Sequence, residues 1–264
     1  MSLLDNEELL SVAVDACLDA SNIIMPSLDV PKETSYKGKT DLVTEIDIRS
    51  EKIIKSIISS SFKDHSIWAE ETGKEETSSD YVWIIDPLDG TTNFVHGYPP
   101  FGISIGVLYR GKPIVGAILE MPSMRLFTAI DDEGAFCEGK KIKCSNTQSL
   151  EKSLLVTGFG YEHGDNWETN MRLFKNFTDK TQGVRRSGSA AVDMCYVASG
   201  KLDAFWEFDL KPWDIAAGLV IAKESGCIIT GIDGEDFNLG MDNILISNKY
   251  IHQNIVKEAA DYLN

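Results

Sequence analysis

The sequence predicts an α+β protein in which sheets and helices are stacked in layers. Three observations predict this class: apolar residues at helical spacing near the start, strand-like apolar segments between residues 81 and 121, and alternating strands and helices after residue 146. The chain has 264 residues, of which 43% are hydrophobic, and this suffices for a substantial core in one large domain or two closely packed subdomains.

Two helices and a group of strands are expected in the first part of the chain. The first helix should begin at a capping box formed by Asp5 and Glu8 and end before Pro26. A second helix should follow Asp47, with isoleucines on its inner face. A strand then leads into Asp86, and two more strands span residues 101–121 on either side of a turn.

After residue 146 the pattern changes to short strands separated by helices. Helices are expected near Trp167–Phe177, at Ser189–Ala198, at Trp213–Glu224 and near the end of the chain. We therefore predict an N-terminal α+β subdomain over residues 1–145 and a C-terminal α/β subdomain over residues 146–264.

The end of the strand that leads into Asp86 carries two carboxylates three residues apart. Asp86 and Asp89 can converge on adjacent cations, because Mg²⁺ prefers oxygen ligands and is usually held by a few carboxylates, waters and phosphate oxygens. Pro87 stiffens the turn between them, so that the carbonyl of Leu88 can face inward as another ligand. These residues predict a metal-assisted phosphate site.

Neighbouring motifs extend this site. Gly90 lets the backbone approach a phosphate, and a helix that opens at Thr91 would point free amides at the anion. Glu70 and Asp214 add carboxylates from distant segments. Asp-Pro and Asp-Gly pairs also form ordinary turns, but a turn does not explain the distant acids, so we favour the catalytic interpretation. Glu71 is either an outer member of the site or a solvated acid.

Together these motifs resemble the inositol monophosphatase family. The family signatures are an acid-acid-Thr element, an Asp-Pro-Leu/Ile-Asp-Gly-Thr-Thr-Asn-Phe element and a Trp-Asp element, and they correspond here to Glu70–Thr72, Asp86–Phe94 and Trp213–Asp214. Further matches at Asp41–Asp47 and Gly188–Asp193 extend the resemblance over nearly the whole chain, and Thr157–His163 is most similar to bacterial, cyanobacterial and plant-plastid members. The resemblance implies a five-layer αβαβα sandwich with the metals between the subdomains.

The resemblance also implies two to three Mg²⁺ ions, with Mn²⁺ as a substitute, and inhibition by lithium. Glu70, Asp86 and the carbonyl of Leu88 would hold the first ion. Asp86, Asp89 and Asp214 would hold the second, and a weaker third ion would also touch Glu70. Two ions about 3.5–4 Å apart can clamp the attacking and leaving oxygens of an in-line displacement.

The catalytic residues implied by the family are Glu70, Thr91 and Asp47. Glu70 and Thr91 would polarise a metal-activated water that attacks phosphorus in line, and Asp47 would orient Thr91. No phosphoenzyme is required.

The implied substrate contacts come from both halves of the chain. They are Asp89, Gly90, Thr91, Gly188, Ser189, Ala190, Glu207, Asp214 and Lys37. Glu207 would bind a ring hydroxyl, while Lys37 resembles a mobile-loop lysine of the family and competes with Lys39 for that role. Asp209 departs from the family pattern, either to accept hydrogen bonds from a polyol and repel a second phosphate or as a solvated side chain.

Composition limits the partners and the compartment. A formal net charge of −16 argues against nucleic-acid binding, and it requires cations wherever acids meet a phosphate. Five cysteines without a Cys-x-x-Cys pair suggest reduced thiols and no zinc site. No signal or membrane-spanning segment is expected, which favours the cytoplasm, or the plastid stroma if a transit peptide has been removed. A homodimer is expected from the family.

Three functions fit these residues. The favoured one is magnesium-dependent hydrolysis of a small phosphate monoester, with myo-inositol monophosphate as substrate. The second is the same chemistry on galactose 1-phosphate, histidinol phosphate or fructose 1,6-bisphosphate. The third is a nonenzymatic regulatory protein that retains the fold, although every implied metal ligand is present in the sequence.

Overall fold

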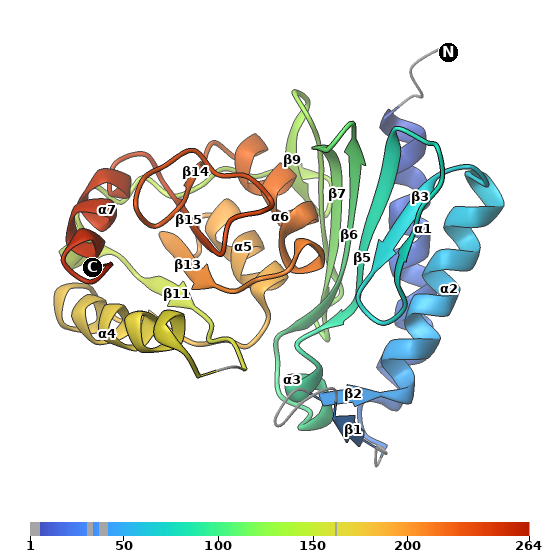
Figure 1. Cartoon of the computed structure of the whole chain (residues 1–264), viewed down its shortest axis with the longest axis horizontal. Coiled ribbons are helices and arrows are strands. Elements are labelled where there is room, and N and C mark those ends of the chain that lie inside the picture. The colour runs from blue at the N-terminus through green and yellow to red at the C-terminus, as the bar shows by residue number, and fades with distance from the viewer. Residues whose placement is uncertain (1–5, 31–33, 37–41, 162, 264) are drawn as a thin grey trace.

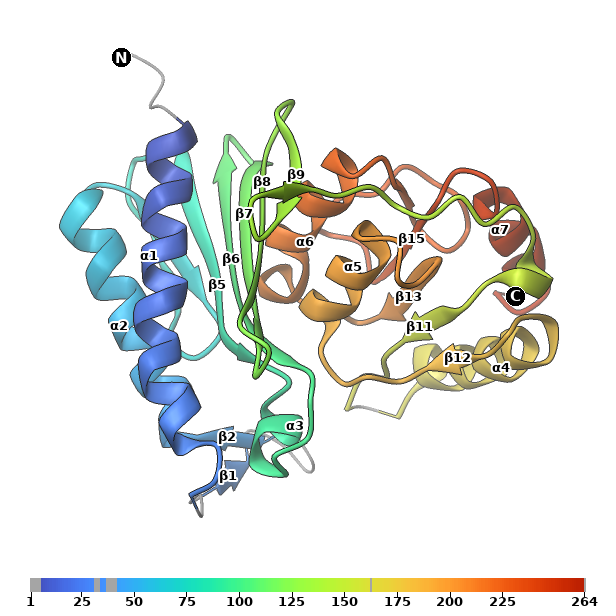
Figure 2. The ribbon, with the colours of Figure 1, turned by 180° about the vertical axis from the view of Figure 1, so that it is seen from behind.

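Two stacked β-sheets lie between three layers of helices in the computed structural model (Figures 1 and 2). The structure describes residues 6–30, 34–36, 42–161 and 163–263. Within these ranges the layers are α1 (Asn6–Ile24) and α2 (Glu45–Ser61), an eight-stranded sheet, α5 (Ala190–Ala198) and α6 (Pro212–Glu224), a five-stranded sheet, and α4 (Asp165–Lys180) and α7 (His252–Ala260). The predicted α+β sandwich of five layers is thereby confirmed. Asp5, Lys37, Lys39 and Asp41 lie outside the described residues.

The first outer layer is a pair of helices joined by a short ribbon. Helix α1 covers Asn6–Ile24 and continues into a 3₁₀ turn at Met25–Ser27, in agreement with the predicted end before Pro26. Strands β1 (Thr34–Tyr36) and β2 (Leu42–Thr44) pair antiparallel, and helix α2 (Glu45–Ser61) follows. Helix α2 begins two residues before Asp47, so Asp47 lies in its first turn.

The larger sheet has the strand order β10-β9-β8-β7-β6-β5-β3-β4, in which β3 and β5 are parallel and the other pairs are antiparallel. Its strands are β3 (Ser66–Ala69), β4 (Gly73–Glu75), β5 (Tyr81–Asp89), β6 (Phe101–Tyr109), β7 (Lys112–Met121), β8 (Arg125–Ile130), β9 (Gly134–Cys137) and β10 (Lys140–Lys141). The pairing of β5 with β6 shifts register between Asp86 and Asp89. This irregularity bends the strand at the predicted metal-binding turn. Helix α3 (Thr91–Val95) starts directly after it.

The smaller sheet has the order β12-β11-β13-β15-β14, with β11 parallel to both of its neighbours and the other pairs antiparallel. Its elements follow the 3₁₀ turn Leu150–Lys152 and are β11 (Leu155–Thr157), α4 (Asp165–Lys180), β12 (Val184–Arg185), α5 (Ala190–Ala198), β13 (Ala204–Phe208), α6 (Pro212–Glu224), β14 (Ile228–Thr230), β15 (Asn243–Ser247) and α7 (His252–Ala260). The helices predicted from the sequence are all found here.

Helix α6 is wedged between the two sheets, and glycines in the larger sheet let it come close. A methyl group at Gly116 would lie 2.3 Å from the carbonyl oxygen of Ala217, and one at Gly106 would lie 2.9 Å from the side chain of Ala216. On its other face, Ile215 and Leu219 pack with the apolar residues of the smaller sheet. Because α6 starts beside the predicted metal turn, this close packing fixes the position of Asp214.

Helix α1 contradicts the expectation that no segment is long and apolar enough to cross a membrane. The segment Asn6–Ser27, of 22 residues, passes that test by length and composition. In the structure, however, its apolar side belongs to the core that covers the larger sheet, and Leu9, Ala13, Cys17 and Ile24 are fully buried there. The apolar character of α1 is thus accounted for by packing within the protein.

The subdomain boundary at residues 145–146 remains a prediction. The chain passes from the larger to the smaller sheet near this point, but α5 and α6 contact strands of both sheets. The two predicted units therefore share a layer of helices.

We expect the substitution Gly116→Ala to destabilise the protein, since the added methyl group must push α6 away from β7. The free energy of unfolding should fall by about 1–3 kcal/mol, as for other overpacked cores. Urea denaturation measures this change, with Gly160→Ala as the control because its nearest neighbour would be an ordinary contact at 3.7 Å. Equal stability of the two variants would show that α6 is not tightly packed.

Candidate active site

The first turn of α2 anchors the site through Asp47. The Oδ2 atom of Asp47 accepts hydrogen bonds from the backbone N–H and the hydroxyl of Thr44, at 2.8 and 2.5 Å, which form a capping arrangement at the start of the helix. Its Oδ1 atom accepts the hydroxyl of Thr91 at 2.8 Å. The Thr91 hydroxyl also lies 3.1 Å from the carbonyl oxygen of Leu88. The structure thus joins Asp47 to Thr91, while the role of Asp47 in orienting Thr91 for catalysis stays a prediction.

The bend at the end of β5 is held by its own side chains and by α2. The Oδ1 atom of Asp86 accepts the N–H of Leu88 at 3.0 Å, and the hydroxyl of Ser50 donates to the carbonyl of Pro87 at 2.9 Å. Asp86 is buried. These bonds fix the turn that carries Asp86, Leu88 and Asp89.

The second carboxylate of the turn connects the two sheets. The Oδ2 atom of Asp89 accepts the hydroxyl of Ser189 at 2.6 Å and the N–H of Ala191 at 2.8 Å, both at the start of α5. Close by, Gly90 has a φ of 86°, and a methyl group there would lie 3.0 Å from the carbonyl oxygen of Gly188. Only glycine fits such a backbone and such a contact. The predicted metal turn and the predicted Gly188–Ala190 segment are therefore in direct contact.

Glu70 and Asp214 reach the same region from β3 and α6. The N–H of Glu70 bonds to the carbonyl of Ile85 at 3.1 Å, which extends the pairing of β3 with β5. The Oδ2 atom of Asp214 accepts the N–H of Lys211 at 2.6 Å, where Pro212 starts α6. The carboxylates of Glu70, Asp86, Asp89 and Asp214 lie near enough to repel one another.

This repulsion and burial change the acidity of the group. Burial, followed by the charges of Glu70, Asp89 and Asp214, raises the pKa of Asp86. Burial also raises the pKa of Asp89 to about 6, although the hydrogen bonds from Ser189 and Ala191 act in the opposite direction. The pKa of Asp214 is raised by burial and by Asp89. Such a site favours cations, because a cation would relieve both the desolvation and the repulsion of the carboxylates.

Glu207 lies on β13, on the smaller-sheet side of the site. It is buried, and a methyl group at Gly158 would overlap its carboxylate at 2.2 Å from Oε1. Burial and the charges of Asp193 and Asp214 raise the pKa of Glu207. Gly158 therefore makes the space that this carboxylate occupies.

Glu51 and Ser50 were not predicted as members of the site. They share the inner face of α2 with Asp47, at spacings of three and four residues that place side chains on one side of a helix. The Oε2 atom of Glu51 accepts the N–H of Glu71 at 2.7 Å, while its buried Oε1 atom has no hydrogen-bond partner among the described residues. The sequence did contain a signal for Glu51. It is a charged residue four positions after Asp47, on a helix face that is otherwise rich in isoleucine.

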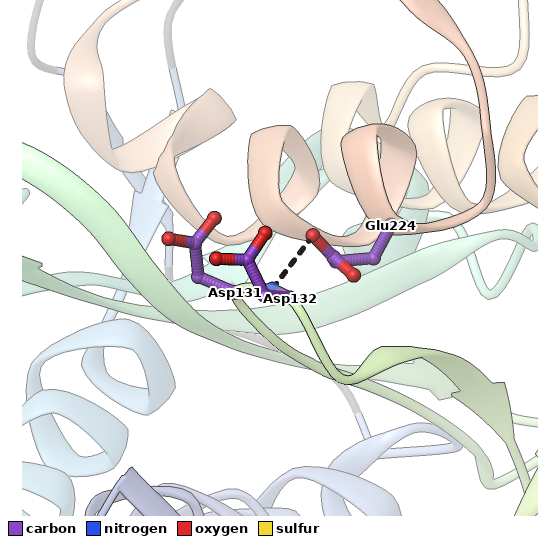
Figure 3. A group of neighbouring side chains, drawn as sticks. All are labelled: Asp131, Asp132 and Glu224. Atoms are coloured by element: carbon purple, nitrogen blue, oxygen red, sulfur yellow. Dashed lines mark hydrogen bonds between the residues drawn. The ribbon is translucent and has the colours of Figure 1, made fainter.

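A second acidic group lies away from this site. Asp131, Asp132 and Glu224 are close together at the end of α6 and the β8–β9 turn (Figure 3). Asp131 pairs with Lys112 and Lys223, while Glu224 accepts the N–H groups of Asp132 and Gly134 at 3.0 and 2.8 Å. Partial burial raises the pKa of Asp131, but the hydrogen bonds from the two lysines outweigh it and lower the pKa. The side chains of Lys112 and Lys223 already neutralise this group. It is therefore an acidic group with a structural role, with which the carboxylates of the candidate site can be compared.

The carboxylates of the first site suit a hard divalent cation. Their donors are oxygens from Glu70, Asp86, Asp89 and Asp214, and oxygen donors are typical for Mg²⁺, Mn²⁺ or Ca²⁺. Apart from Lys37, which lies outside the described residues, the structure brings the predicted site residues to one junction between the sheets. Their individual roles remain predictions.

Comparison with known proteins places the chain in a family. The family model described as the inositol monophosphatase family matches residues 5–264. A phosphatase named IMPL1, chloroplastic, from Arabidopsis thaliana is 47% identical over 96% of this chain and 70% of its own length. Inositol-1-monophosphatase from Synechocystis sp. is 42% identical, with coverage of 97% and 90%.

Two further matches broaden this result. A protein from Aquifex aeolicus named fructose-1,6-bisphosphatase/inositol-1-monophosphatase is 38% identical over 97% of both chains. The solved structure of inositol monophosphatase from Anabaena (Nostoc) sp. superposes with a TM-score of 0.89, at 38% identity and 98% coverage of each chain. The metal dependence of such proteins agrees with the acidic junction described above. The chain belongs to the inositol monophosphatase family and is a phosphoric monoester hydrolase.

Proposed function

We propose that this protein hydrolyses myo-inositol monophosphate to inositol and phosphate with the help of Mg²⁺. The observation that carries the proposal is a junction of mutually repelling carboxylates, with Asp86 buried and the others partly exposed, beside the Thr91–Asp47 hydrogen bond. The similarity to proteins named inositol-1-monophosphatase supports the choice of substrate.

Glu70, Asp86, the carbonyl of Leu88, Asp89 and Asp214 would hold the cations. When bound, divalent cations would neutralise these acids, polarise the phosphate ester and stabilise the leaving oxygen. Mn²⁺ offers a similar preference for oxygen ligands and is a possible substitute. Hydrogen bonds fix Asp89 to the start of α5 and Asp214 to the start of α6, and would thereby orient these two carboxylates as cation ligands.

Thr91 and Glu70 would orient the attacking water. The proton of the Thr91 hydroxyl is directed to Asp47 and to the carbonyl of Leu88, so the oxygen lone pairs are left to accept a hydrogen bond from water. Glu70 would accept the second proton. Asp47 acts through Thr91 and is a positioning residue in this scheme.

The substrate hydroxyls would meet Glu207 and the segment Gly188–Ala190. Glu207 has a buried carboxylate on the side of the site opposite to β5, and we assign it to a ring hydroxyl. Lys37 would contact the phosphate from the segment outside the described residues.

Fructose 1,6-bisphosphate is the second candidate substrate, because the Aquifex relative carries both activities in its name. Asp209 favours a monophosphate substrate over a bisphosphate. It is exposed, with a φ of 63°, and accepts the side-chain amide of Asn166 at 2.7 Å. Asp209 follows Glu207 by two residues, and a carboxylate that faced the substrate there would repel a second phosphate group.

We also propose that the protein is a homodimer in the cytoplasm, or in the plastid stroma if a transit peptide has been removed. Family resemblance supports the homodimer, and cysteines without a Cys-x-x-Cys pair support a reducing compartment.

A panel of substrates tests the proposal. Phosphate release should be fastest from inositol 1-phosphate and should require Mg²⁺, compared with galactose 1-phosphate, histidinol phosphate and fructose 1,6-bisphosphate. A faster reaction of another ester would change the substrate but keep the mechanism. No reaction with any of them would favour a regulatory protein.

We expect Asp89→Asn to reduce kcat by roughly 100-fold or more, since the amide keeps the shape of the side chain but removes a charge that would hold a cation. Steady-state phosphate release at saturating Mg²⁺ measures the loss. The matched control is Asp131→Asn in the lysine-paired acidic group, which should retain activity. Full activity of the Asp89 variant would refute its assignment.

The metal-free protein should show the raised pKa of Asp89 as a dependence of stability on pH. The folded carboxyl holds its proton up to about pH 6, whereas an unfolded aspartic acid loses its proton near about pH 4. Its contribution to stability is therefore present below the unfolded pKa and is lost as pH rises through the folded pKa. Between pH 4 and pH 8, the stability of Asp89→Asn relative to wild type should increase by up to about 3 kcal/mol.

Urea unfolding in chelator at both pH values measures this difference. The control Asp131→Asn should change in the opposite direction, because the pKa of Asp131 is lowered in the folded state and its ion pairs stabilise the protein at the higher pH. The same sign for both variants would contradict the assignment.

A further inference from the structure

Two cysteines that are far apart in the sequence meet where the chain crosses between the sheets. Cys144 lies in the segment that leads away from β10, and its N–H donates to the carbonyl of Ser225 at 3.1 Å. Cys227 follows α6 just before β14. A methyl group at Gly226 would lie 4.0 Å from the sulfur of Cys144, and the hydroxyl of Ser225 lies 3.4 Å from the sulfur of Cys227. The two side chains thus lie against the same short turn at residues 225–227, although no Cys-x-x-Cys motif connects them.

The other cysteines differ from this pair. Cys17 and Cys195 are fully buried, whereas Cys144 and Cys227 are half-buried. Cys227 also lines a groove of about 330 Å³ beside Lys112 and Lys223. Reagents from solution can therefore reach the pair, but not the two cysteines in the core.

The two thiols differ in acidity. Interaction with the Cys227 thiol lowers the pKa of Cys144 to about 7, against a smaller opposing effect of burial, and the charge of Lys249 adds to the lowering. The same interaction, together with burial, raises the pKa of Cys227. Since the thiolate is the nucleophile in disulfide exchange, Cys144 would react first and Cys227 second.

We propose that Cys144 and Cys227 are a reversible disulfide site that links the inter-sheet segment to the end of α6. The oxidant is a small-molecule or protein disulfide. The Cys144 thiolate attacks one of its sulfurs to form a mixed disulfide and releases the first thiolate. Cys227 then loses its proton, attacks the Cys144 sulfur and releases the second thiolate. Two protein thiols are oxidised and one external disulfide is reduced to two thiols.

The link should stabilise the fold and leave the active site intact. A disulfide between distant residues restricts the unfolded chain more than the folded one. Asp214 lies at the opposite end of α6 from Cys227, so the new bond does not contact the acidic junction. The proposal is independent of the substrate that the enzyme uses.

Treatment of the reduced full-length protein with oxidised glutathione tests the proposal. After acid quenching, alkylation and digestion, mass spectrometry should find a Cys144–Cys227 cross-link in wild type. It should also appear in Cys137→Ser, the control that removes another half-buried thiol. In Cys227→Ser the mixed disulfide with glutathione should persist on Cys144. Free alkylated Cys144 and Cys227 in oxidised wild type, or faster reaction of Cys137 than of Cys144, would overturn the proposal.

Thermal unfolding gives a second readout on the same samples. The Tm of wild type and of Cys137→Ser should rise on oxidation and return to its first value on reduction. The Tm of Cys227→Ser should not rise. An unchanged or lower Tm in cross-linked wild type would overturn the stabilising role, and a loss of phosphatase activity on cross-linking would contradict the separation from the active site.

Discussion

Mutual repulsion among the carboxylates at the junction of the two sheets is the constraint around which this structure is arranged. Asp86 is buried, while Asp89 and Asp214 are partly exposed. N–H and hydroxyl donors hold all three, and no lysine or arginine within the described ranges donates a hydrogen bond to them. The acidic group at Asp131 shows the alternative, because two lysines neutralise it directly. Neutral donors keep the first group oriented while its charge stays available for a cation. An acidic group held by neutral donors can bind a cation, whereas an acidic group paired with lysines stabilises the fold.

The scaffold keeps these acids together by letting backbones approach closely. The register shift in β5 bends the strand between its two aspartates, and Gly90 brings the turn against Gly188. Gly116 lets α6 pack onto the larger sheet, so the helix carries Asp214 to the same point. Because α6 is packed between two sheets, the sheets and not the solvent-exposed loops determine its position. The rigidity of the site thus originates in contacts that contain no catalytic group.

Local motifs predicted much of the fold and most of the candidate site. The acids at Asp86 and Asp89 follow an apolar strand, and the helices after residue 146 have clear periodicity. Glu51 was missed because its hydrogen bond to the N–H of Glu71 depends on which loop α2 faces. The approach of Cys144 to the turn that carries Cys227 was missed because tertiary packing alone creates it. Helix α1 was misjudged for a related reason. Its apolar composition is equally compatible with a membrane and with a sheet, and only the folded arrangement distinguishes them.

The inner face of α2 makes three contacts with two separate segments within little more than one helical turn. Asp47 bonds to Thr91, Ser50 to the carbonyl of Pro87, and Glu51 to the N–H of Glu71. A slide or rotation of this helix would move both segments together, so their relative alignment depends on the position of α2. The helix pair α1–α2 lies on the outside of the molecule. A displacement of this pair would nevertheless misalign Thr91, Pro87 and Glu71 relative to one another.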